Sequence, residues 1–107
     1  MKQECIESLA SVLKGTATWR KGTAARFPDD GRNMRAAYTL EKLAVEAADL
    51  TDAQWLELQR HYSWESKTWR DAVNQTARQV GFAFRAGDLD YFVRELVKTL
   101  SLLSVAA

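Results

Sequence analysis

Residues 89–103 have the sequence LDYFVRELVKTLSLL, the most strongly patterned stretch of the chain. Its apolar residues recur every three or four positions, a spacing that places them on one face of an α-helix. Burying such a stripe contributes on the order of 10–20 kcal/mol before the entropy of ordering is subtracted. The stretch therefore predicts a core helix whose loss would unfold the protein. Its apolar stripe consists of Leu89, Phe92, Val93, Leu96, Val97, Leu100 and Leu103.

Helical patterns also cover most of the chain before residue 89. The clearest helix start is the phrase around Thr51, because Thr51 and Gln54 have the spacing of a capping box, and Leu50 and Trp55 that of a hydrophobic staple. Asp29 or Asp30 is expected to cap an earlier helix. The periodicity predicts helices over about residues 2–14, 30–49, 51–62 and 65–86.

Composition agrees with a helical fold. The chain has 107 residues, of which 47% are hydrophobic and 27% charged, the balance of an ordinary globular protein. It contains a single proline, Pro28, and is rich in Ala, Leu, Glu, Arg and Gln, which favour helix. We expect residues 1–107 to form one domain of the all-α class. Short connections between the later helices predict antiparallel neighbours in a compact bundle of four or five helices.

Residues 14–27 hold a tandem repeat, KGTATWR over 14–20 followed directly by KGTAARF over 21–27. Gly15 is expected to end the first helix, since glycine commonly follows a helix C-terminus. Because this part of the chain lacks a helical apolar period and contains several glycines, we predict an irregular basic connection near residues 15–30.

A β-hairpin is the alternative for the same segment. Lys21 and Gly22 would form its turn, and residues 16–20 would pair with 23–27, since threonine and tryptophan are typical of strands. Two isolated strands are only marginally stable without further packing, so the irregular connection is preferred.

The formal net charge is only +1, so any binding of nucleic acid must come from a local patch. Residues 14–35 supply such a patch, because six cations stand there against Asp29 and Asp30, with aromatic side chains between them. Cations that contact phosphates and aromatics that stack on bases are typical of single-strand binding. In the alternative interpretation the aromatics anchor the segment and the cations are merely solvated. The candidate anion or nucleic-acid site is Lys14, Trp19, Arg20, Lys21, Arg26, Arg32 and Arg35.

A second candidate site is a protein interface. Four large aromatics, Trp55, Tyr62, Trp64 and Trp69, lie close together in sequence, and one helical face cannot bury them all. At least one is therefore expected at a partner-binding surface, with ordinary core packing as the alternative. The predicted helix over 65–86 also carries a cationic strip, which is read either as a solvated face or as a DNA-reading helix. The candidate interface residues are Trp64, Trp19, Arg78 and Arg85.

Residues that carry catalysis or bind metal are sparse. His61 and Cys5 are the one histidine and the one cysteine, and they lie on separate predicted helices. No metal site, cofactor motif or phosphate-binding loop is predicted, and we expect no enzymatic activity. The lone cysteine and the absence of a leader pattern favour the cytoplasm, and no apolar run is long enough to cross a membrane.

The sequence thus predicts a small non-enzymatic interaction or regulatory protein that binds a protein partner. A nucleic-acid-binding module using residues 14–35 is the alternative. A homodimer through the C-terminal helix is a third arrangement, because Leu102, Leu103 and Val105 extend its apolar surface.

Overall fold

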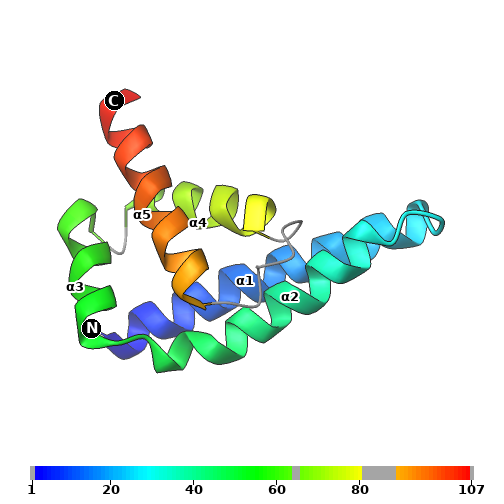
Figure 1. Cartoon of the computed structure of the whole chain (residues 1–107), viewed down its shortest axis with the longest axis horizontal. Helices are drawn as coiled ribbons and strands as arrows, with labels where there is room; N and C mark the ends of the chain where they lie inside the picture. Colours follow the sequence, from blue (N-terminus) through cyan, green and yellow to red (C-terminus); the bar gives the residue numbers. More distant parts are fainter. Residues whose placement is uncertain (1, 64–65, 81–88, 107) are drawn as a thin grey trace.

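The computed structural model describes residues 2–63, 66–80 and 89–106, which form α-helices and one short 3-10 helix, with no β-strand among them (Figure 1). The prediction of an all-α bundle of four or five helices is confirmed. The elements are α1 (Lys2–Arg26), α2 (Arg32–Glu46), the 3-10 helix η1 (Ala47–Asp49), α3 (Asp52–His61), α4 (Lys67–Val80) and α5 (Leu89–Ala106).

The helices α1 and α2 run antiparallel side by side and are joined by a turn over residues 27–31 (Figure 1). α4 packs against α1, and α5 packs against both α4 and α3. The tip of the α1–α2 pair projects beyond the other helices, and α5 points away from the pair at its C-terminal end (Figure 1).

The helix α1 contradicts the predicted irregular connection near residues 15–30, because residues 15–26 continue it without a break. Gly15 does not end the helix, and the hairpin alternative is also wrong. The physical reason is the period of the repeat, since seven residues are close to two helical turns and equivalent positions therefore fall on one face. Ala17 and Ala24 are accordingly both buried.

The threonines of the repeat are compatible with this helix because they bond within it. The hydroxyls of Thr16, Thr18 and Thr23 donate to the carbonyls four residues earlier, at 2.9, 3.1 and 3.1 Å. This pattern satisfies the side-chain donors without a strand or a turn. Small side chains then allow close helix packing, and those buried on α2 and η1 are Ala36, Ala37, Ala44 and Ala47.

The predicted start of α3 is confirmed. Thr51 Oγ1 accepts a hydrogen bond from the Gln54 amide at 3.2 Å, and the Thr51 amide donates to Gln54 Oε1 at 2.9 Å. Leu50 and Trp55 are both 4% exposed, as expected for the hydrophobic staple.

The start of α2 differs in detail from the prediction. Gly31 occupies the N-cap position and makes no side-chain cap, so neither Asp29 nor Asp30 is the cap residue. The carboxylate of Asp30 nevertheless accepts a hydrogen bond from the Arg32 amide at 3.1 Å. Asp30 therefore satisfies one amide of the first turn from just outside the helix.

The core is one cluster of buried side chains to which α1, α2, α3, α4 and α5 all contribute, and the predicted α5 stripe faces it. Thr76 of α4 is the polar residue at its centre, fully buried; its hydroxyl donates to Thr99 Oγ1 at 3.1 Å. Thr99 in turn donates to the Glu95 carbonyl at 2.9 Å, so this buried pair is satisfied. The buried residues of the α5 stripe are Phe92, Val93, Leu96 and Leu100, and Leu89, Val97 and Leu103 are partly buried against them.

We expect Gly22→Ala to stabilise the protein by about 0.5–1 kcal/mol, because glycine is disfavoured in a helix interior. A Cβ at Gly22 meets nothing within 4 Å, and no glycine in the described part of the chain has positive φ. Urea denaturation followed by circular dichroism measures the change. A loss of stability would contradict the continuous α1.

Candidate functional site

An open pocket of about 260 Å³ lies between α1 and α4. On α1 its lining residues are spaced by three or four positions, and on α4 by four, so each helix contributes one side-chain stripe. We call it the Trp19 pocket; it is lined by Val12, Gly15, Thr16, Trp19, Asn74 and Arg78.

Trp19 forms one wall of the pocket and is 49% exposed, which is unusual for so large an apolar side chain. Two guanidinium groups accompany its ring. The Cζ atom of Arg20 lies 4.9 Å from the ring centroid and that of Arg78 lies 5.6 Å from it. Both distances are within the range of cation–π attraction, so the arginines hold the indole in place at the surface.

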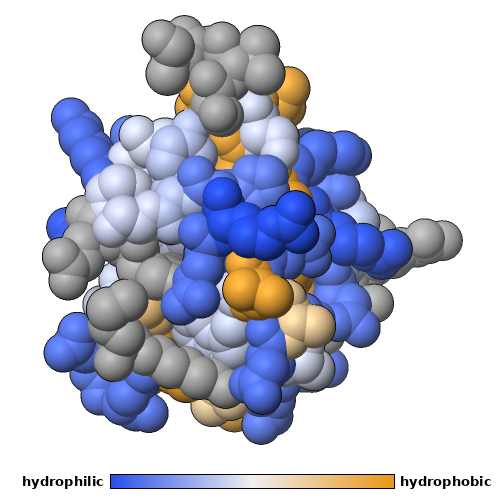
Figure 2. Space-filling model, turned by 90° about the vertical axis from the view of Figure 1, so that its left-hand side faces the viewer, coloured by the Kyte–Doolittle hydropathy of each residue, from blue (hydrophilic) through white to orange (hydrophobic). Residues whose placement is uncertain are grey.

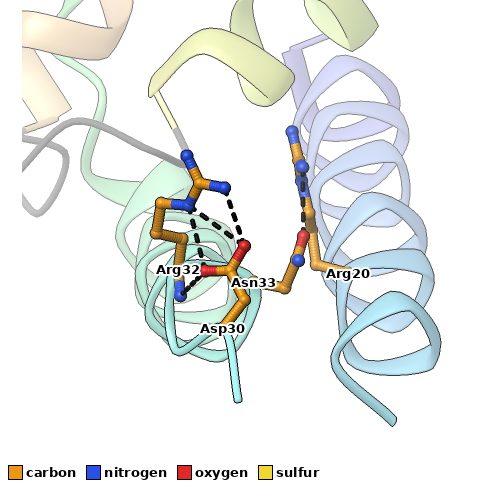
Figure 3. Close-up of polar contacts among 4 residues, drawn as sticks. All are labelled: Arg20, Asp30, Arg32 and Asn33. Atoms are coloured by element: carbon orange, nitrogen blue, oxygen red, sulfur yellow. Dashed lines mark hydrogen bonds and ion pairs between the residues drawn. The ribbon is translucent and has the colours of Figure 1, made fainter. Parts of the chain in front are cut away.

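Arg20 is the buried member of this group, only 5% exposed. Its Nη1 donates to Asn33 Oδ1 at 3.3 Å, and Figure 3 shows the side chain reaching from α1 to Asn33 of α2. Its Nη2 donates to the Arg78 carbonyl at 3.1 Å. That carbonyl belongs to α4. A single guanidinium therefore joins three helices.

The pKa of the Arg20 guanidinium is lowered from its ordinary value. Burial of the side chain is the main cause, and the nearby positive charge of Arg78 is the second. Arginine remains protonated even so, because its ordinary pKa is far above neutral pH. Arg78, which lines the pocket, and the buried Arg20 next to it thus place two positive charges close together.

Three of the six cations predicted to bind nucleic acid are either paired with an acid or buried. Lys21 forms an ion pair with Glu41, whose hydrogen bond raises the pKa of the lysine. Arg32 pairs with Asp30 at 2.7 Å, and both face each other at the start of α2 (Figure 3). Arg20 is buried in the bundle.

The other three cations of that set, Lys14, Arg26 and Arg35, are exposed. Arg26 Nη2 lies 3.5 Å from Thr23 Oγ1, and Arg35 lies against Gly31 of the turn between α1 and α2. The cations of the predicted basic segment thus have different environments: some are exposed, two are paired with acids and one is buried.

Of the predicted interface residues, Trp19 and Arg78 are brought together although they are distant in sequence. Trp64 and Arg85 lie outside the described residues. Sequence reasoning missed Asn33 as the partner of Arg20. It also missed Gly15 as part of the pocket, because the glycine was read as a helix end; the seven-residue period of the repeat was the signal that could have placed it on α1.

The residues that sequence analysis considered for catalysis or metal binding do not form a site in the described part of the chain. Cys5 lies in the core at 4% exposure, and within the described ranges no three His, Cys, Asp or Glu side chains are grouped to hold a metal ion. No described helix is long and apolar enough to cross a membrane.

A second pocket, of about 360 Å³, lies between α3 and α5 and mixes charges of both signs. The surface on the α3 side of the molecule is mostly hydrophilic, with hydrophobic areas small and separate (Figure 2). Gln54 and Asp90, which both line this pocket, are hydrogen-bonded to each other. The pocket is lined by Gln54, Glu57, Asp90, Val93 and Arg94.

Comparisons of the chain with known protein families, with curated proteins and with solved structures return no match.

We expect Arg20→Lys to destabilise the protein by about 1–3 kcal/mol, because one ammonium cannot reproduce the forked contacts and the buried Asn33 oxygen loses its donor. Urea denaturation measures the loss, and Arg26→Lys, an exchange of the same type at an exposed site, is the control. Equal stability of the two variants would contradict the three-helix role of Arg20.

The hydrogen bonds from Arg32 lower the pKa of Asp30 to about 2. Since the unfolded chain has the ordinary, higher pKa, this pair stabilises the fold above about pH 4, and the stabilisation is lost as the pH falls toward 2. Carboxyl titration by NMR should find the Asp30 pKa raised toward its ordinary value in Arg32→Ala and unchanged in Arg26→Ala. An unshifted pKa in the wild-type protein would contradict the pair.

Proposed function

We propose that this protein is a non-enzymatic interaction protein that binds a protein partner by receiving one of the partner's side chains in the Trp19 pocket. The observation that carries the proposal is a half-exposed tryptophan whose ring is contacted by two arginine guanidinium groups, beside an open pocket. Tryptophan and arginine are the residues most enriched among the energetic centres of protein interfaces.

The size of the pocket favours a partner side chain over a free small molecule. Pockets that bind cofactors or drug-sized ligands usually have volumes of about 300–1,000 Å³. The Trp19 pocket, at about 260 Å³, lies below this range and is open to solvent along the groove between α1 and α4. It fits one anchoring side chain, while the surrounding helices supply the rest of a contact surface.

The charge distribution favours protein over nucleic acid. Binding of nucleic acid draws its affinity from several cations that neutralise phosphates together. Here Lys21 and Arg32 are already paired with acids, and Arg20 is buried. These three cations are less available to phosphates, so the 14–35 segment offers less charge for nucleic acid than its sequence suggests.

We propose that the protein is regulatory, because binding to a partner's surface can control what else that partner binds. We also propose that it acts in the cytoplasm, since a chain with one cysteine forms no internal disulfide and suits a reducing compartment. A second copy of the chain is the alternative partner, through the end of α5, where Leu102 is 67% exposed.

The repeat provides a matched pair of variants to test the proposal. Gly15 and Gly22 are equivalent positions on α1, both are open to a larger side chain, and Gly15 is the one that lines the pocket. We expect Gly15→Met to fill the pocket and to abolish capture of a stoichiometric partner from cell extract, whereas Gly22→Met retains it.

The capture is repeated after nuclease treatment, with sedimentation of the purified protein as a further measurement. A companion that is lost after nuclease treatment would point to nucleic acid instead. A companion retained equally by both methionine variants, or a dimer that dissociates with Leu102→Ser, would overturn the proposed site.

A further inference from the structure

We propose that the Trp19 pocket is selective for an acidic side chain, a glutamate or aspartate of an acidic peptide segment in the partner. This inference rests on the proposed function and specifies the chemistry that the pocket recognises. It follows from the charge, the polar lining and the apolar wall of the pocket.

The charge of the pocket is positive and available. Arg78 is exposed, and within the described ranges no carboxylate forms an ion pair with its guanidinium. The nearest acid before it on the same helix face, Asp71, is seven positions away, or about 10.5 Å along the axis. A carboxylate entering the pocket would therefore meet a guanidinium that is not already neutralised by a neighbouring acid.

Arg20 adds a second positive charge next to the pocket. Its guanidinium lies 4.9 Å from the Trp19 ring and donates to the Arg78 carbonyl, although the side chain is buried and is not part of the lining. A carboxylate in the pocket would therefore lie near two guanidinium groups, one of them exposed.

The rest of the lining fits the shape of an acidic side chain. The Trp19 ring and Val12 offer an apolar surface for its methylene groups, and Asn74 adds an amide that donates hydrogen bonds. Glycine at position 15 leaves the floor open, since no heavy atom lies within 4 Å of a Cβ built there. One arginine beside an aromatic wall suits a carboxylate on a short apolar stem.

The site is also held in place before binding. Arg20 connects Arg78's backbone to α1 and α2, so the helix that carries the recognising guanidinium is fixed relative to the wall formed by Trp19. A preformed site loses less conformational entropy on binding. This supports recognition by geometry and charge together.

The test uses a phage-displayed library of random dodecapeptides, selected on the full-length protein and counter-selected on Gly15→Met. We expect the selected peptides to share a glutamate or aspartate next to an apolar residue. In a synthetic peptide of this kind, replacing the acid by its amide should weaken binding roughly 10- to 100-fold, the usual range for losing a charge-assisted hydrogen bond.

Arg78→Gln should bind the acid and amide peptides equally. Arg70→Gln removes the same charge from α4 two turns earlier, about 12 Å along the axis and beyond the screening length at physiological salt, and should keep the full discrimination. Unfolding curves of both variants check that the fold is intact.

The outcomes separate the two proposals. Selected peptides that bind in a Gly15-dependent way but carry no acid would overturn the acidic selectivity and leave the proposed function standing. Selection of no peptide that Gly15→Met weakens would overturn both. A single-stranded oligonucleotide that competes for the pocket more strongly than any selected peptide would assign it to nucleic acid instead.

Discussion

The arrangement of this protein depends on the guanidinium of Arg20. It leaves α1, reaches Asn33 in the first turn of α2 and the Arg78 carbonyl in the last turn of α4, and lies beneath the ring of Trp19. The hydrophobic effect brings these helices together but is not directional. The planar Arg20 guanidinium has hydrogen-bond donors at fixed angles, so its bonds favour one relative position of the helices. This contact connects α4 to α1 at the place where the two helices form the pocket.

Two cations of the basic segment are paired with acids within the protein, and this affects what remains for binding. Arg32 pairs with Asp30 at the start of α2, and Lys21 of α1 pairs with Glu41 of α2. Such exposed pairs add little stability, but they neutralise these two cations. The Trp19 pocket remains as the distinctive feature, because it combines a concave shape with the positive charge of Arg78.

The helix α1 illustrates how packing overrides intrinsic preference. Two glycines and several threonines are poor helix formers, yet the helix runs through them without interruption. Ala17 and Ala24 lie against α2, where small side chains allow close contact, and the threonine hydroxyls bond back to their own helix. The resulting gap at Gly15 becomes part of the pocket, so a residue that weakens the helix also shapes the site.

The sequence by itself determined the all-α class, the α5 stripe and the start of α3, because these depend on spacing along a single helix. It also singled out Trp19, Arg20 and Arg78 by residue type. The continuity of α1 and the meeting of Trp19 with Arg78 were decided only by tertiary structure. Local propensity at the glycines was outweighed by burial against α2, and the α1–α4 contact joins side chains that no short-range pattern relates.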